Sequence, residues 1–383
     1  MKKLVGFLFA IGIGIFIFGS CVRNDDEPEM AMRPIARLYI SIGNYQTNTS
    51  EDAIDNVLLI DPADTTQMDV VLSHHSGALE GGTGIFFDPY QTGLFQAGYG
   101  TDDTTIRVMK VGPLGMIQNS GQIQYRGLNA MRGLVYNYRK GIETLYVTNN
   151  SATVEERRTI YGYRLPYNQR GYTLPHKVFR LDPSMRPWGV VLWNDSLLVS
   201  NASSTNGGVS LYGGLSQVDS LAPDFQAMAT VRIAGATAIR GIAFVDSLDL
   251  LVAADYGTGD PRNPVSDGRI YIIEGIKEKL SEGGTTTVTP TRTIQGPLTG
   301  LTGPMDVAID PRRRLKDGKR TIFVADYDYE NKGRIARFLL SDNGNVAPES
   351  AVSLDTLGTP RKPFGLFLDV RGVPGSPVPE ELH

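Results

Sequence analysis

The sequence predicts an all-β protein, folded as a closed six-bladed β-propeller, and three observations carry this prediction. A short apolar strand pattern recurs six times, at intervals of 49 to 65 residues. Each interval has room for four strands of about five residues and their turns, and none shows helical periodicity. The last copy stands alone, so it can complete the first unit and close the ring, which removes the open sheet edges.

The first strand of each repeat follows a glycine or its equivalent and ends near Asp or Asn. Its copies are GIFFD (84–88), GLVYN (133–137), GVVLWND (189–195), GIAFVD (241–246), DVAID (306–310) and GLFLD (365–369). The second strands that follow are LFQAG (94–98), LYVTN (145–149), LLVSN (197–201), LLVAAD (250–255) and IFVAD (322–326). A sixth second strand, LYISIGN (38–44), has no first strand before it.

Third and fourth strands complete each predicted blade. The third strands are NVLLIDP (56–62), TIRVMKV (105–111), TIYGYRL (159–165), VSLYGGL (209–215), RIYIIEG (269–275) and RIARFLL (334–340). The weaker fourth strands include DVVLSHH (69–75), KVFRLD (177–182), TVRIAG (230–235) and TRTIQG (291–296). Six blades therefore occupy residues 37–371, with closure between the C-terminal strand and the first blade, while the linker 276–305 leaves room for a seventh.

One repeat carries a family resemblance. The segment IFVADYDYENKGRI (322–335) resembles the L-[FY]-V-A-D…N-x-R-[IV] signature of NHL-repeat propellers, and LLVAADYGTGDPRNPVSDGRI (250–270) is a looser match with an insertion. More broadly, the repeats are similar to the six-bladed group that includes TolB and the gluconolactonase-like lactonases. The resemblance covers about residues 36–371 and implies the fold. Because one propeller fold hosts many functions, it implies little about chemistry.

Residues 1–20 are predicted to be a lipoprotein signal peptide. Two lysines precede an apolar run at 4–18, which is shorter than the roughly 20 residues of a membrane span. The run leads into GSC, which ends on the chain's single cysteine, Cys21. This pattern resembles a bacterial lipobox, which implies cleavage before Cys21 and lipidation of its thiol. An ordinary secretory signal with a coincidental cysteine is the alternative.

The segment that follows the cysteine predicts where the protein is held. Residues 21–36 read as a lipidated Cys and flexible tether, and residues 372–383 as a Pro-rich C-terminal tail. The acidic stretch VRNDDEPEM (22–30) resembles the surface-export signal of Bacteroidota lipoproteins. We therefore expect an outer-membrane protein that contacts the membrane through its lipid anchor only. The cell surface is the preferred placement, with the periplasmic face as the alternative.

A ring of polar residues is predicted where each second strand meets its loop. Asp326 is matched there by Asp255, Asn201, Asn149 and Asn44. Asp and Asn suit turns because their side chains bond to nearby backbone groups, so a structural role is one interpretation. The other is ligand binding, since the six loops converge on the funnel face of a propeller. Two tyrosines, Tyr256 and Tyr327, directly follow their strands.

A second predicted ring consists of cations just before the first strands. They are Arg132, Arg186, Arg240 and Lys362, with Trp188 and Phe364 beside them. Guanidinium groups bind carboxylates through paired N–H groups, and aromatic rings stack on sugars, so this ring favours an anion or a polyol. The alternative is that each arginine pairs with a neighbouring Asp and ties blades together.

Several function classes are excluded or left open by composition and motifs. A net charge of −4 without a basic face argues against nucleic-acid binding. No G-x-S-x-G, HExxH or cysteine nucleophile appears, so catalytic residues are unknown and an enzyme is not favoured. No metal ligands or cofactors are predicted, although a calcium site would leave little trace. The lactonase resemblance implies a divalent ion held by Glu, Asn and Asp, and no matching Glu appears in the first or second strands.

The leading interpretation is a cell-envelope lipoprotein whose propeller funnel binds a polar or anionic ligand, such as a glycan, or a protein partner. The alternatives are a metal-dependent hydrolase or lactonase of the gluconolactonase type, and a structural subunit of an envelope complex. The predicted ligand-binding residues are Arg132, Arg186, Trp188, Arg240, Lys362, Phe364, Asn149, Asn201, Asp255, Tyr256, Asp326 and Tyr327.

Overall fold

The computed structural model describes residues 35–43, 54–139, 142–151, 158–218, 220–222, 224–259, 265–355 and 361–371. The predicted signal peptide, the lipidated Cys21, the tether before residue 35 and the tail 372–383 lie outside these residues. Among the helices of the described residues, none is both long and apolar enough to cross a membrane.

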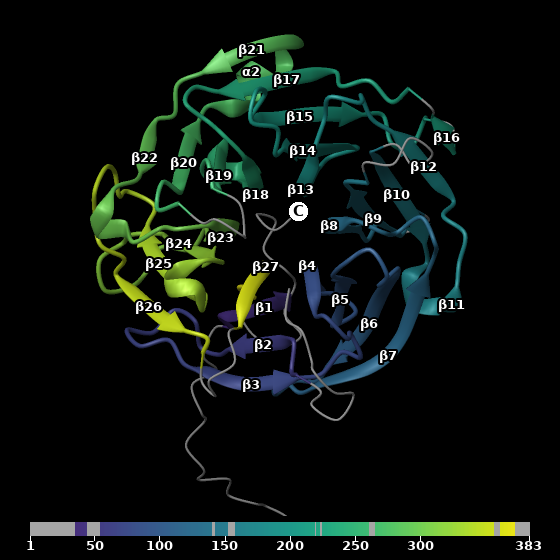
Figure 1. Ribbon diagram of the computed structural model, residues 1–383, viewed down its shortest axis with the longest axis horizontal. Helices are drawn as coiled ribbons and strands as arrows, with labels where there is room; N and C mark the ends of the chain where they lie inside the picture. Colours follow the sequence, from purple (N-terminus) through teal and green to yellow (C-terminus); the bar gives the residue numbers. More distant parts are fainter. Residues whose placement is uncertain are drawn as a thin grey trace, which may run out of the picture. The chain divides into compact units, whose positions relative to one another are not determined.

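Six antiparallel sheets surround a common centre (Figure 1), which confirms the predicted all-β six-bladed propeller. The innermost strands are β4 (Gly82–Asp88), β8 (Met131–Asn137), β13 (Pro187–Trp193), β18 (Ile239–Val245), β23 (Pro304–Asp310) and β27 (Lys362–Asp369). The second strands are β1 (Arg37–Gly43), β5 (Gly93–Gly98), β9 (Thr144–Asn149), β14 (Ser196–Asn201), β19 (Leu250–Asp255) and β24 (Thr321–Asp326).

The outer half of each blade follows the same order. The third strands are β2 (Val57–Ile60), β6 (Thr105–Val111), β10 (Thr159–Arg164), β15 (Gly208–Gly213), β20 (Arg269–Glu274) and β25 (Arg334–Leu339). The fourth strands are β3 (Val70–His74), β7 (Ile117–Gln124), β12 (Lys177–Arg180), β17 (Ala229–Ile233), β22 (Arg292–Ile294) and β26 (Ser350–Ser353).

The ring closes as the sequence predicts. Strand β27, the last of the described chain, pairs antiparallel with β1, the first, and Phe367 lies directly opposite Tyr39. The first blade therefore has the strand order β27-β1-β2-β3 and joins the two ends of the propeller in one sheet. Backbone hydrogen bonds along this pair hold the ring shut and leave no open inner edge.

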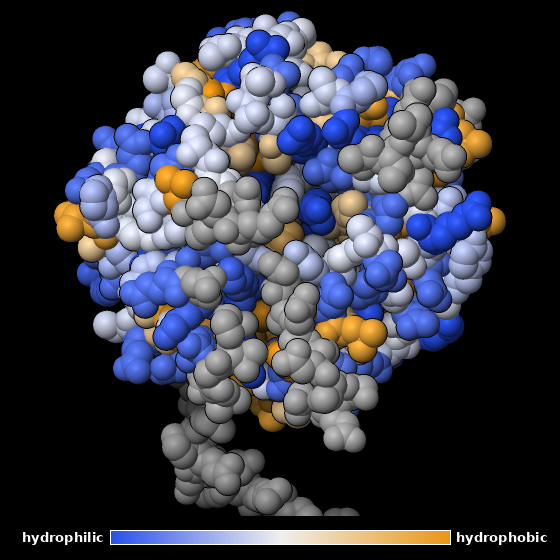
Figure 2. Space-filling view, viewed as in Figure 1, coloured by the Kyte–Doolittle hydropathy of each residue, from blue (hydrophilic) through white to orange (hydrophobic). Residues whose placement is uncertain are grey.

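The core lies between adjacent blades, which explains the strand patterns in the sequence. Second strands such as β5 and β24 are buried at every position, because a neighbouring blade covers each of their faces. They therefore read as continuous apolar runs. The outermost strands β3 and β26 alternate between partly buried and exposed residues. Figure 2 shows a mainly hydrophilic face with hydrophobic residues in small separate patches.

Short strands cover several outer edges. Strand β11 (Arg170–Tyr172) adds in parallel to β7, β16 (Leu221–Ala222) to β12, and β21 (Gly284–Val288) to β17. The linker 276–305 is therefore not a seventh blade. Its helix α2 (Ile276–Ser281) precedes β21, and β21 forms the outer edge strand of the preceding blade. Covering an edge satisfies its backbone groups and blocks pairing with other chains.

Every inner strand carries a β-bulge at the same point, shown by a shift in its pairing register. The second bulge residue is glycine in five strands, at Gly84, Gly133, Gly189, Gly241 and Gly365, and Asp306 in the sixth. Glycine is needed because neighbouring blades touch here. A Cβ on Gly84 would lie 2.3 Å from the carbonyl oxygen of Arg132, and one on Gly365 would lie 2.6 Å from that of Thr83.

We expect Gly84→Ala to lower the free energy of unfolding by about 2–3 kcal/mol, because the new methyl group overlaps the backbone of the next blade. Gly112→Ala is the matched control, since a Cβ there would have its nearest neighbour at 3.7 Å. Its effect should stay within about 0.5 kcal/mol. Urea unfolding followed by circular dichroism measures both. Equal effects of the two substitutions would contradict tight packing of the blades at the bulge.

Candidate ligand site on the funnel face

The first bulge residue of each inner strand places a side chain where the inner strands begin, on the side we call the funnel face. These residues are Thr83, Arg132, Trp188, Arg240, Met305 and Phe364. The prediction of four cations in equivalent positions is therefore corrected. Arg132 and Arg240 directly precede the bulge glycine of their strands, whereas Arg186 and Lys362 lie two residues earlier, and Trp188 and Phe364 take the equivalent position. Arg186 is exposed, and its backbone N–H donates to Asn201.

An aromatic pair closes the centre of this face. Trp188 and Phe364 come from blades that are three apart in the ring of six, so they meet across its centre. Their rings stack with centroids 5.7 Å apart and planes 14° from parallel. Tyr99 and Tyr327 contact the same Phe364 ring edge-on, at 5.7 and 5.9 Å. The pair forms an aromatic floor with a further aromatic residue on either side.

Two guanidinium groups flank this floor. The Cζ atoms of Arg132 and Arg240 lie 4.7 and 4.5 Å from the Trp188 ring centroid, and Arg240 also lies 3.4 Å from that of Tyr256. These distances are those of cation–π contacts. Burial lowers the pKa of both arginines to about 10, so both remain protonated at neutral pH.

Most hydrogen-bond donors of these two arginines are unfilled. Arg132 Nη1 donates to the Met131 carbonyl oxygen at 2.8 Å, and Arg240 Nη1 contacts Met305 Sδ at 3.0 Å. The Nε atoms of both are buried and have no hydrogen-bond partner in the described part of the chain. No carboxylate of a described residue lies within 4.0 Å of either guanidinium. An arginine offers five N–H donors, so both can bind a further acceptor.

The remaining cation of the site is neutralised. Lys362 Nζ lies 2.9 Å from Asp328 Oδ1, and the Asp328 side chain is fully buried. The other Asp328 oxygen accepts a hydrogen bond from the Tyr256 hydroxyl, and burial together with this bond raises the pKa of Tyr256. Lys362 also lies 4.9 Å from the Tyr327 ring centroid. With this pair balanced, the two arginines leave the site with two excess positive charges. We use the name funnel site for the side chains of Tyr99, Arg132, Trp188, Arg240, Tyr256, Tyr327, Asp328, Lys362 and Phe364.

The predicted turn residues tie four of the six second strands to the loop before the inner strand of the same blade. Asn149 accepts from the backbone N–H of Ala130, and Asn201 from that of Arg186, both at 2.9 Å. Asp255 accepts from the N–H groups of Thr237 and Ala238 at 2.9 and 2.7 Å.

Asp326 is held in the same way and also by an ion pair. It accepts from the N–H groups of Thr302 and Gly303, and Arg334 Nε lies 3.1 Å away. Burial raises its pKa, and the charge of Arg334 opposes that rise. Ile42 occupies the equivalent position in the first blade. Asn44 lies outside the described residues. Ligand binding by the four turn residues stays a prediction.

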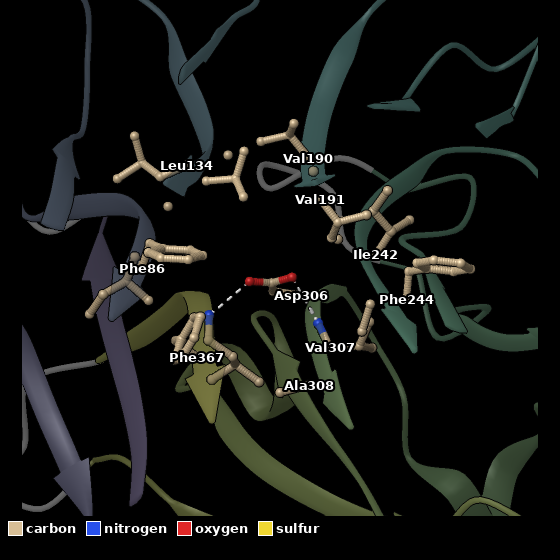
Figure 3. Close-up of a pocket in the computed structure, with 18 of the residues that line it drawn as sticks. Phe86, Leu134, Val190, Val191, Ile242, Phe244, Asp306, Val307, Ala308 and Phe367 are labelled. Atoms are coloured by element: carbon tan, nitrogen blue, oxygen red, sulfur yellow. Dashed lines mark hydrogen bonds between the residues drawn. The ribbon is translucent and has the colours of Figure 1, made fainter. Parts of the chain in front are cut away.

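Beneath the aromatic floor, the inner strands enclose a cavity of about 210 Å³, which we call the hub cavity. Its walls are mainly apolar, and Asp306 stands in their midst (Figure 3). Asp306 is the one carboxylate among the described residues that line it, and it accepts from the N–H groups of Val307 and Leu366 at 2.9 and 2.8 Å. Burial raises its pKa to about 7.

Sequence reasoning missed Asp306, although a signal was present. Five of the six first strands begin with glycine, and DVAID (306–310) has an aspartate in that place. The predicted ligand-binding residues also leave out Met305, which shares the bulge position of the arginines. No group of three or more His, Cys, Asp or Glu residues suited to a metal ion occurs among the described residues.

No protein-family model matches the sequence, and no curated protein matches it. Solved structures do. A periplasmic gluconolactonase from Pseudomonas aeruginosa aligns with a TM-score of 0.51 and 13% identity over 90% of this chain and 100% of that one. A candidate 6-phosphogluconolactonase from Bacteroides fragilis aligns with a TM-score of 0.51 and 12% identity, over 90% of this chain and 100% of that one. A protein from Lactobacillus plantarum aligns with a TM-score of 0.53 and 10% identity, over 88% of this chain and 99% of that one.

At these identities the likeness concerns the fold alone. The chain is a six-bladed β-propeller, and gluconolactonase-like propellers are among its structural neighbours.

The paired and unpaired cations should respond differently to substitution. Lys362→Met leaves the buried Asp328 without its cation, so the free energy of unfolding should fall by about 3 kcal/mol. Arg240→Met removes no ion pair and keeps an apolar chain against Tyr256 and Trp188, so the change should stay within about 1 kcal/mol. Urea unfolding measures both. A loss with Arg240→Met as large as that with Lys362→Met would mean that Arg240 ties blades together.

Proposed function

We propose that this protein is a lipid-anchored envelope protein whose propeller binds an anionic ligand at the funnel site. The observation that carries the proposal is the pair of arginines, Arg132 and Arg240. Arg240 is buried and Arg132 is partly buried, both remain charged at neutral pH, and both have donors without partners in the described part of the chain. A charge removed from water without a partner is unfavourable, so a bound anion would provide the ion pair and hydrogen bonds that the described side chains do not.

The aromatic floor narrows the class of anion. Trp188 and Phe364 present aromatic surface between the two guanidiniums, with Tyr99 and Tyr327 at the side. A sugar ring places C–H groups on aromatic faces, and a carboxylate accepts two N–H bonds from one guanidinium. A glycan that carries carboxylates therefore uses both features of the site. An acidic side chain of a partner protein would use the guanidiniums in the same way.

The family-implied divalent ion of the lactonases does not fit this site. Asp328 is engaged by Lys362 and Tyr256, and Asp306 lies below the floor in a mainly apolar cavity. The described residues include no group of three or more His, Cys, Asp or Glu side chains that could hold an ion. We therefore derive no hydrolytic step through a metal.

Sequence features support the placement in the envelope. The apolar run at 4–18 and the GSC that ends at Cys21 resemble a lipoprotein signal, the acidic residues after it resemble a surface-export signal, and the NHL- and TolB-like repeats suit a display platform. These features favour the outer membrane of a Bacteroidota-type cell.

Lipidation is tested directly at Cys21. In cells fed an alkyne-bearing fatty acid, the protein should become labelled and partition into membranes, because acyl chains anchor it. Cys21→Ser should abolish both labelling and membrane association while the strand signal in circular dichroism is kept. An unlabelled wild-type protein would refute the lipid anchor.

Ligand binding is tested by calorimetry with a digalacturonate and its neutral counterpart, a digalactose. The charged sugar should bind at least about tenfold more tightly at low salt, and the preference should shrink as salt is added, since ions screen the guanidiniums. The double substitution Arg132→Gln/Arg240→Gln should lower affinity for digalacturonate at least about tenfold.

Arg232→Gln is the matched control, since Arg232 is an exposed arginine on the outer strand β17. It should leave binding unchanged. Equal binding of both sugars, or equal binding by wild type and the double variant, would refute an anion site between the two arginines.

A further inference from the structure

We propose that the hub cavity is a second binding site, for a small and mainly apolar molecule that carries one protonated amine, with Asp306 as its counter-ion. The cavity shares Arg132, Trp188 and Phe364 with the funnel site, but its counter-ion Asp306 and most of its apolar walls belong to it alone, so the amine proposal can be tested without the funnel ligand. The size of the cavity, the chemistry of its walls and the surroundings of Asp306 support it.

The cavity is large enough for an organic ligand and is built to hold hydrocarbon. It measures about 210 Å³, whereas a single water needs only about 10–15 Å³. Figure 3 shows apolar side chains around the space, which include Phe86, Leu134, Val190, Ile242 and Phe244. Such walls favour apolar groups, because these leave water when they bind.

Asp306 has binding capacity that the fold does not use. A carboxylate offers about four lone-pair sites, and two of them accept the N–H groups of Val307 and Leu366. The carboxylate lies in the middle of the cavity (Figure 3). No cation of a described residue lies within 4.0 Å of it. A protonated amine would supply both the missing charge and hydrogen bonds to the free lone pairs.

The blade geometry does not call for an acid at this position. The five equivalent bulges carry glycine and form the same pairing shift, so Asp306 is not needed to build the bulge. An isolated carboxylate in an apolar cavity is unfavourable unless it is paired or protonated. Its hydrogen bond from the Leu366 N–H group links β23 to β27, but a neutral acceptor would serve that purpose, so the charge is what the fold does not explain.

Other titratable groups around the cavity leave Asp306 as the one that changes charge near neutral pH. The described lining contains Arg132 and Tyr136 from β8, and Tyr138 just beyond that strand. Lining residues from β4, β13, β18 and β27 include no other titratable side chain. Burial raises the pKa of Tyr136, and the pKa of Arg132 is about 10. The pKa of Asp306, about 7, lies well below both.

The test uses benzylammonium as the probe and benzyl alcohol as its neutral counterpart, titrated into the full-length protein by calorimetry. At pH 8.5 the amine should bind with one-to-one stoichiometry and at least about tenfold more tightly than the alcohol, because the carboxylate is ionised. At pH 5.5 Asp306 is protonated, and the amine affinity should fall by about tenfold or more.

Three variants and one control separate the contributions. Asp306→Asn should lower amine affinity at least about tenfold, remove its pH dependence and change alcohol affinity less than about threefold. Asp306→Gly installs the residue of the other five blades and provides the same test if the Asn variant does not fold. Ala308→Phe should fill the cavity and abolish binding of both probes, while Arg232→Gln should leave both unchanged.

Several outcomes would overturn the proposal. They are the absence of saturable amine binding at pH 8.5, equal affinity for amine and alcohol, unchanged amine binding in both Asp306 variants, and retained binding in a folded Ala308→Phe protein.

Discussion

Pairing of β27 with β1 is the interaction on which the rest of the structure depends. It joins residues 362–369 to residues 37–43 in one sheet and turns a chain of repeats into a ring. Closure brings Phe364 across the centre to Trp188, and it brings Lys362 to Asp328. An open array of the same blades would carry the same side chains without assembling either the aromatic floor or the ion pair.

At the level of the bulges, the centre of the closed ring is divided into the funnel site and the hub cavity. Glycine at five bulges lets the backbones of neighbouring blades touch, so the ring is narrow at that level. The residue before each bulge position faces the funnel, several of these residues also border the hub cavity, and the residues after the bulge form the rest of its walls. The same bulge thus recurs in every blade, and the residues that differ between blades at this point, Trp188, Phe364 and Asp306, give the two sites their chemical character.

Charge is distributed unevenly between the two compartments. Asp328 and Lys362 balance one another, whereas Arg132 and Arg240 have no acidic partner among the described residues, and Asp306 has no basic one. Arg240 lies in the funnel site, Asp306 lies in the hub cavity, and Arg132 borders both. Arg240 is buried, and Arg132 and Asp306 are partly buried. A charge that is largely removed from water and has no partner is unfavourable, and such charges are more common where a ligand binds. Both proposed sites follow from this separation.

The sequence by itself determined the repeat, the number of blades and the closing strand. Strand patterns are local: a strand between two blades is apolar along its whole length, and Asp or Asn ends it where a turn begins. Only the tertiary structure decided which side chains meet. Trp188 rather than Arg186 occupies the position equivalent to Arg132, because the residue directly before the bulge glycine is the one that enters the centre of the ring. The linker 276–305, read as room for another blade, instead covers the edge of β17. Asp306 stands out only because apolar residues from the other five blades surround it. The distances between blades depend on ring closure, which no short stretch of sequence encodes.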